Sequence, residues 1–167
     1  MTGMPVPLLR LTHPDFAPNL LHWGIQYVSA ELRDALALGP DVVEYLPVDS
    51  SRSSAAACAR DYMVMNVLNT RELIDLNRVA HERVMLPVEF GRPEMRETVI
   101  RKPEQRIYWR EDFVPDVPLF HAAHSPWIIA TDAFAERVLR SGVADVEFQD
   151  ITSDHAQVDG TITLKTL

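Results

Sequence analysis

The stretch Trp127–Thr152, WIIATDAFAERVLRSGVADVEFQDIT, repeats a plan already present in Ile25–Asp49, IQYVSAELRDALALGPDVVEYLPVD. In both, an apolar strand precedes a hydroxyl residue that can cap a helix, a short amphipathic helix, a glycine stop and a second strand. Ser29 of the first stretch matches Thr131 of the second at an offset of 102 residues. The pattern predicts two related strand–helix–strand units, and therefore an α+β protein with a mixed β-sheet and a few short helices.

The residues inside the two units favour duplication over a chance likeness of generic elements. The segment Val43–Tyr45 matches Val146–Phe148, because each reads valine, glutamate and an aromatic residue. Caps, apolar stripes and glycine stops are common, so the alternative of two independent units stays open. If the two strands of a unit are parallel and adjacent, the connection through the helix is expected to be right-handed.

Other elements are expected between and around the units. Tyr62–Leu68 is apolar on both faces, which is typical of a central, buried strand. Pro47 lacks a backbone donor and is expected at a strand end or on an edge strand. A helix is predicted over Thr70–Val79, a loop over Ser50–Ala57, and an exposed excursion that returns to a strand over Arg92–Arg110.

The length of 167 residues fits a single domain, residues 1–167. Within it we expect a core over about residues 23–152, a proline-rich lead-in over residues 1–22, and a C-terminal extension or strand over residues 153–167. Cys58 is the one cysteine, which agrees with a reducing compartment. The N-terminus does not read as a signal peptide, and no apolar run approaches the roughly 20 residues that span a bilayer. A cytoplasmic protein without a membrane partner is expected.

The formal net charge of −8 is concentrated in one part of the chain. Residues 111–167 hold 3 basic and 10 acidic side chains, a net charge of −7. This balance argues against a nucleic-acid partner, which requires clustered cations. An acidic surface that attracts a basic protein partner is one interpretation, and a solvated surface is the other. The candidate partner-binding residues are Glu111, Asp112, Asp116, Asp145, Glu147 and Asp150. Glu147 matches Glu44 of the first unit, so either side chain can instead simply face solvent.

Motifs for catalysis are scarce. The chain has neither a glycine-rich phosphate loop nor a G-x-S-x-G nucleophile motif. His121 and His124 form H-x-x-H, but a stable zinc site needs three or four ligands. No catalytic residue, metal ligand or cofactor is therefore predicted, and the chain is not expected to be an enzyme. The alternative from this pattern is a metal-dependent hydrolase that uses the two histidines and nearby carboxylates.

Three stretches carry a family resemblance. They are Tyr62–Asn69 with the following segment Arg71–Leu76, the aspartate-to-Leu-Phe segment Asp116–Phe120, and the closing strand, cap, helix, glycine and strand of Ile128–Phe148. In this order they resemble the bacterial polymorphic-toxin immunity proteins of family eleven, formerly a domain of unknown function. Ile25–Val48 is similar to the strand and helix that often precede them.

The resemblance implies a protein that binds and neutralises a cognate toxin, and it implies no catalytic residues. A nuclease-type toxin tends to be basic, so the acidic segment would complement it. We expect an interface of roughly 1,200–2,000 Å². A non-catalytic adaptor of a secretion system remains the other alternative.

Overall fold

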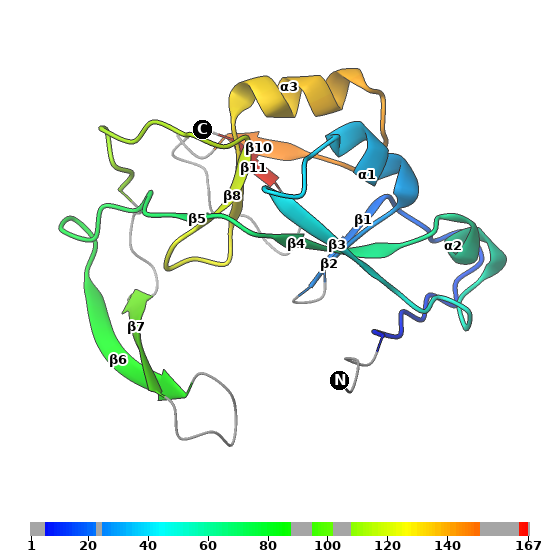
Figure 1. The fold of residues 1–167 in the computed structure, drawn as a ribbon, viewed down its shortest axis with the longest axis horizontal. Helices are drawn as coiled ribbons and strands as arrows, with labels where there is room; N and C mark the ends of the chain where they lie inside the picture. The colour runs from blue at the N-terminus through cyan, green and yellow to red at the C-terminus, as the bar shows by residue number, and fades with distance from the viewer. Residues whose placement is uncertain (1–5, 23–24, 88–94, 102–107, 151–163, 167) are drawn as a thin grey trace.

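The computed structural model describes residues 6–22, 25–87, 95–101, 108–150 and 164–166 (Figure 1). These residues form three helices, an antiparallel four-stranded sheet, a mixed five-stranded sheet and a separate two-stranded ribbon. The predicted α+β class with a mixed sheet is confirmed. Within these ranges no helix combines the length and the apolarity that crossing a bilayer requires.

The first sheet has the strand order β1-β2-β4-β3, and every neighbouring pair is antiparallel. Its strands are β1 (Leu20–His22), β2 (Gln26–Val28), β3 (Val43–Pro47) and β4 (Met63–Val67). As predicted, β4 is central and largely buried. Pro47 is the last residue of the edge strand β3, where its missing N–H breaks no bond within the sheet.

The second sheet has the strand order β10-β11-β9-β8-β5. Its strands are β5 (Thr70–Arg71), β8 (Leu119–Ala122), β9 (Ile128–Ala130), β10 (Phe148–Asp150) and β11 (Leu164–Thr166). The strands β10, β11 and β9 are parallel, whereas β8 is antiparallel to β9 and parallel to β5. The chain passes from the first sheet to the second between β4 and β5 (Figure 1). Residues 151–163 lie outside the described residues, as do Trp23 and Gly24 at the start of the expected core.

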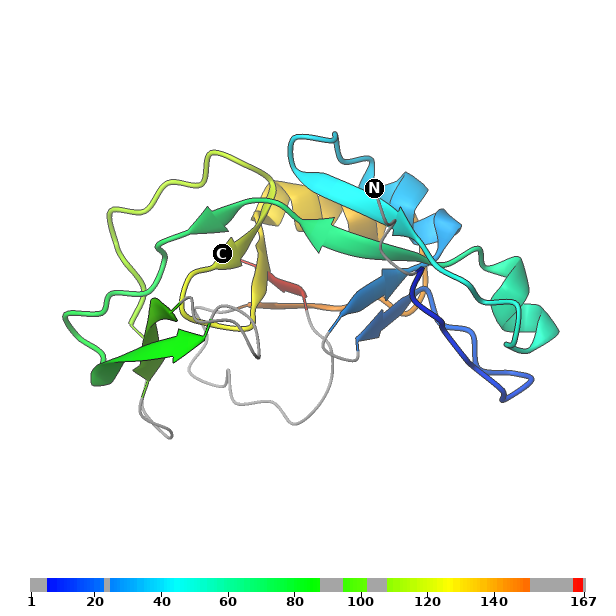
Figure 2. The ribbon, with the colours of Figure 1, turned by 60° about the horizontal axis from the view of Figure 1, so that its bottom comes forward.

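The helices α1 (Ala30–Leu36) and α3 (Asp132–Arg140) lie beside each other (Figures 1 and 2). Leu36 of α1 and Val138 of α3 belong to the apolar stripes predicted from the sequence, and both are buried in one core cluster. That cluster also takes side chains from strands of both sheets. The guanidinium of Arg137 in α3 donates to the backbone carbonyl of Leu36 at 2.5 Å. The two units therefore share one hydrophobic core instead of forming separate ones.

The strands of each unit are parallel, but they are not adjacent. Both β2 and β3 run antiparallel to β4, which lies between them. In the second unit β9 and β10 run parallel to β11, which lies between them. The condition of adjacent strands, on which the expected right-handed connection depended, is thus not met, because in each unit a strand from later in the chain lies between the two. The repeated feature is a pair of parallel strands that are joined by a helix and separated by one intervening strand.

The helix ends show which local signals act. The hydroxyl of Ser29 accepts from the Leu32 N–H at 3.1 Å, as predicted for an N-cap. Thr131 occupies the N-cap position of α3 without a side-chain capping bond. Gly142 follows α3 with φ of 78°, a left-handed conformation that glycine adopts without steric cost. Helix α1 ends earlier than Gly39, because Ala37 adopts φ 45° and ψ 47° and closes it.

The helix predicted over Thr70–Val79 is wrong. Thr70 and Arg71 form β5 and pair with β8, and Ile74 forms an isolated bridge with Trp109. Only a turn remains, in which the Asp75 carbonyl accepts from the Arg78 N–H at 3.1 Å. Pairing with residues about 35 to 50 positions later overrides the local helical pattern.

Two further segments differ from expectation. Helix α2 (Ala55–Ala59) begins inside the predicted loop Ser50–Ala57, because Ser54 caps it and alanine is the best helix former. The predicted excursion Arg92–Arg110 contains the strand β7 (Met95–Arg101), which pairs antiparallel with β6 (His81–Pro87). Together these two strands form the separate ribbon.

A buried polar network links the two units. Asn19 and Ser29 are the buried polar residues of the described chain, at 1% and 0% exposure. The Ser29 hydroxyl donates to the Asn19 side-chain oxygen at 2.6 Å, and the Asn19 amide donates to the Ala144 carbonyl at 3.1 Å. Arg60 also donates to the Asn19 oxygen, at 3.2 Å. The segment that precedes β1 is thereby joined to the turn that precedes β10.

Candidate functional site

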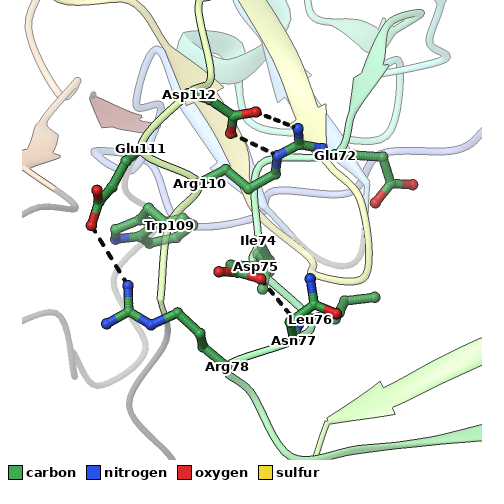
Figure 3. Close-up of a pocket in the computed structure, with 10 residues that line it drawn as sticks. All are labelled: Glu72, Ile74, Asp75, Leu76, Asn77, Arg78, Trp109, Arg110, Glu111 and Asp112. Atoms are coloured by element: carbon green, nitrogen blue, oxygen red, sulfur yellow. Dashed lines mark hydrogen bonds and ion pairs between the residues drawn. The ribbon is translucent and has the colours of Figure 1, made fainter.

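A surface pocket of about 630 Å³ opens between the segments Glu72–Arg78 and Trp109–Asp112 (Figure 3). The two segments run antiparallel through the bridge between Ile74 and Trp109. The Asp75 N–H donates to the Tyr108 carbonyl at 2.8 Å, and the Arg110 N–H donates to the Leu73 carbonyl at 2.9 Å. Backbone pairing therefore fixes both walls of the pocket relative to each other.

The pocket rests on a small hydrophobic cluster of its own. Leu73, Phe120 and Ile129 are buried there, and Trp109 packs against them. The Trp109 ring lies 5.7 Å from the Trp127 ring, centroid to centroid, at an interplanar angle of 49°. Such tilted aromatic contacts stabilise packing beyond the area that they bury. The side chains that line the pocket consequently project from a well-packed base.

Charged side chains dominate the lining. Four carboxylates (Glu72, Asp75, Glu111 and Asp112) and two guanidinium groups (Arg78 and Arg110) leave a net charge of −2. Arg110 pairs with Asp112 through two hydrogen bonds of 2.8 and 3.1 Å. Arg78 approaches Glu111 at 3.7 Å, and its guanidinium carbon lies 4.2 Å from the centroid of the Tyr108 ring.

The pKa values follow this arrangement. The hydrogen bonds with Asp112, and then its charge, raise the pKa of Arg110, with smaller contributions from Asp75 and Glu72. The same hydrogen bonds lower the pKa of Asp112. Three of the four carboxylates, Asp112, Asp75 and Glu72, thus act on the single guanidinium group of Arg110, and of these three Asp112 is hydrogen-bonded to it.

Three of the six predicted acidic residues lie at or next to this pocket. Glu111 and Asp112 line it, and Asp116 lies a few residues further along the same loop. Asp116 accepts two hydrogen bonds from Arg71 of β5, at 2.7 and 2.8 Å, and these lower its pKa. Each of the three carboxylates is therefore paired with an arginine, although all three remain exposed.

The other three predicted acidic residues follow α3. Asp145 lies in the turn before β10 with φ of 62°, Glu147 lies between that turn and the strand, and Asp150 ends β10. All three are exposed. Burial raises the pKa of Tyr62 to about 12, and the neighbouring charges of Arg60 and Asp145 act on it in opposite directions. Asp145 thus lies near Tyr62, which precedes β4, and the second group of acids belongs to a different segment from the pocket. Glu44, the counterpart of Glu147, is also exposed.

The two histidines of the H-x-x-H pattern have different surroundings. His121 is half-buried in β8, and this burial lowers its pKa. His124 has φ of 62°, and its Nε2 lies 3.3 Å from the Glu72 carboxylate at the pocket. Across the described ranges, no group of three His, Cys, Asp or Glu side chains could hold a metal ion.

The sequence did not indicate the pocket itself. Glu72, Asp75 and Arg78 belong to the segment predicted as a helix, and Arg110 belongs to the predicted excursion. Their approach depends on the bridge between Ile74 and Trp109, which joins residues 35 positions apart. No local pattern marks such a bridge. The aromatic pair Tyr108–Trp109 was the nearest available signal, since such pairs serve as core or interface residues.

Comparison with known families gives one assignment. The model of the Immunity protein family (Imm11) matches residues 8–153. The chain belongs to this family. The match covers both strand–helix–strand units, the pocket and all six predicted acidic residues. It confirms the resemblance to immunity proteins of family eleven, and it indicates toxin immunity as the general function of this Imm11 chain. A comparison with curated proteins finds no match.

Proposed function

We propose that this Imm11 protein neutralises a cognate protein toxin by binding it directly, and that the pocket lined by Glu72–Arg78 and Trp109–Asp112 lies in the contact surface. The observation that carries the proposal is the pocket itself. It combines a net negative lining with walls that are held together by backbone pairing. We call this surface the pocket face and include Asp116 in it.

The pocket face suits a basic partner. A positively charged toxin side chain that enters it meets Glu72, Asp75 and Glu111 within one small volume. The long, exposed contact between Arg78 and Glu111 is easily exchanged, because solvent-exposed ion pairs contribute little to stability. A basic group of the partner can therefore replace Arg78 as the ion-pair partner of Glu111 with little loss of free energy. The overall charge of −8 would accelerate the encounter.

The second acidic group, Asp145, Glu147 and Asp150, is proposed as a further attraction for the same basic partner. Its residues are exposed and lie on a separate segment. In this proposal the protein acts by binding in the cytoplasm, without catalysis and without a bound cofactor. Partners other than the toxin, such as nucleic acid or a membrane, are not required by it.

The experiment begins with co-expression of the wild-type chain and the toxin encoded beside it. If the wild type fails to rescue cells from that toxin, the immunity proposal falls and an adaptor role becomes the better one. With rescue established, binding of a catalytically inactive toxin is measured by calorimetry across a salt series. The double variant Glu111→Gln with Asp112→Asn removes two charges from the pocket face.

The control is Glu136→Gln on α3. Glu136 is exposed and pairs with Arg140 at 2.9 Å, so this variant breaks one exposed ion pair away from the pocket, whereas the pocket variant breaks two. We expect the pocket variant to weaken binding and to reduce its salt dependence, whereas the control leaves both unchanged. Equal affinities and equal salt dependence for wild type, pocket variant and control would remove the pocket from the contact surface. The variant Asp145→Asn with Glu147→Gln tests the second group in the same assay.

A further inference from the structure

The ribbon of β6 and β7 stands apart from the rest of the protein. Both strands have seven residues, and they pair with each other over their full length and with no other strand of the described chain. Figures 1 and 2 show the ribbon extending away from the two sheets. None of the three core clusters contains a residue from either strand. The ribbon is thus the one part of the described fold that carries long strands without a core beneath them.

Large apolar side chains are exposed on both faces of the ribbon. The register pairs Pro87 with Met95, so Met85 and Met95 share one face. Leu86 and Ile100 lie on the opposite face, since their positions alternate with those. These four side chains are between 42% and 55% exposed. Each face thus mixes exposed apolar side chains with polar ones, whereas the exposed face of a solvated ribbon is predominantly polar.

An isolated two-stranded ribbon is marginally stable in water, because it has no hydrophobic face to bury. Neither edge of the ribbon pairs with another strand among the described residues, and proteins normally cover or shorten such edges. Here both strands are long, and Arg83 with Glu97 makes an exposed cross-strand ion pair at 3.2 Å. A long ribbon of this kind, with exposed apolar residues on both faces, points to a partner that covers it.

The ribbon begins and ends at the pocket. Strand β6 starts three residues after Arg78, which forms part of one pocket wall, and the other wall begins at Trp109, after β7. The base of β6 is fixed, because Val79 is buried and the His81 ring bonds the Val79 carbonyl at 2.9 Å. A partner seated on the pocket face therefore meets the ribbon as a continuation of the same surface.

We propose that the β6–β7 ribbon is an arm that binds the toxin. This inference rests on the proposed function of the pocket face. Its occupant is an apolar groove of the toxin that adjoins the basic patch facing the pocket. A second copy of this chain is a poorer occupant, because two molecules of charge −8 repel each other. The pocket supplies charge recognition, and the arm supplies buried apolar area.

The test uses the full chain and the catalytically inactive form of the toxin encoded beside it. Two double variants, Met85→Thr with Met95→Thr and Leu86→Thr with Ile100→Thr, remove the apolar side chains from one face each. Threonine keeps a high β-propensity, so the ribbon is expected to form. The control is Leu139→Gln on α3, which replaces an apolar side chain of similar exposure (52%) away from the arm.

We expect each double variant to weaken toxin binding at least tenfold while the salt dependence of binding stays as in the wild type. The control should bind like the wild type. If both arm variants bind as tightly as the wild type while the pocket variant weakens binding, the arm inference fails and the proposed function stands. If the wild type sediments as a dimer that the arm variants dissociate, the second copy is the occupant and the inference is overturned.

Discussion

Asn19 is the residue whose replacement tests the structure most directly. Its side chain is 1% exposed and joins Ser29 at the start of α1 to the Ala144 carbonyl before β10. Replacement by alanine removes both links and leaves the buried Ser29 hydroxyl without its acceptor. The sequence offered no reason to single out this asparagine, so the prediction rests on the fold alone.

The expected loss of stability follows from the three bonds. Two neutral hydrogen bonds contribute about 0.5–1.5 kcal/mol each. The Ser29 hydroxyl, which is fully buried, also loses its acceptor, and an unsatisfied buried group costs about 1–3 kcal/mol. The bond from Arg60 adds little, because that guanidinium keeps its bonds to Glu31 and to the Ala17 carbonyl. We therefore expect Asn19→Ala to lower the free energy of unfolding by about 2–4 kcal/mol. For a chain of this length the midpoint temperature should fall by roughly 5–15 °C.

Equilibrium unfolding in urea, followed by tryptophan fluorescence and circular dichroism, measures the loss. The matched control is Asn66→Ala, because Asn66 is exposed on β4 and makes one bond to Glu44 at 3.2 Å. It should cost less than about 0.5 kcal/mol. If the two alanine variants lose the same small amount, the buried network does not hold the two units together, and the reasoning is refuted.

Three further predictions concern the effect of single substitutions on the free energy of unfolding. Burial raises the pKa of Tyr62 to about 12, so the unfolded state loses its phenolic proton first and the free energy of unfolding falls as the pH rises from 10 to 12. Unfolding curves of Tyr62→Phe should show a smaller alkaline loss of stability. At neutral pH this variant should cost about 1 kcal/mol, because the hydrogen bond to the Pro18 carbonyl is lost. Burial lowers the pKa of His121, so the free energy of unfolding should fall as the pH drops below 6.5. His121→Gln should reduce this loss of stability at acidic pH, whereas His13→Gln, at an exposed position, should leave it unchanged. Ala37 closes α1 in a left-handed conformation, so Ala37→Gly should raise the free energy of unfolding by about 0.5–1 kcal/mol, and a loss of stability would contradict the strain assigned there.

The sequence predicted those parts of the fold in which local chemistry decides. Ser29, Gly142 and the apolar stripes of α1 and α3 act through neighbours within one helical turn. The segment Thr70–Val79 carried a helical pattern as well, yet it pairs with strands that follow much later. A single sequence does not show which distant segment will compete for a strand. The same reason explains why the sequence did not predict that β4 lies between β2 and β3, or that β11 lies between β9 and β10.

The acidic residues of the candidate site show the same division. Composition located the excess charge in residues 111–167. The structure adds the arginines that accompany it: Arg71 pairs with Asp116, and Arg78 approaches Glu111. Both arginines lie more than thirty residues away in the chain, so composition alone made this part of the surface more negative than it is. The placement of the partner surface on these acids stays a prediction.

The position of β11 has a consequence for folding during synthesis. All four strands of the first sheet lie within residues 20–67, so that sheet can pair early as the chain emerges from the ribosome. The strands β9 and β10 have their common neighbour only once residues 164–166 have been made. Until then the facing edges of β9 and β10 stay open, and open edges invite pairing with other chains and cleavage by proteases. During synthesis the second sheet therefore remains open to pairing with other chains and to proteolysis for longer than the first sheet.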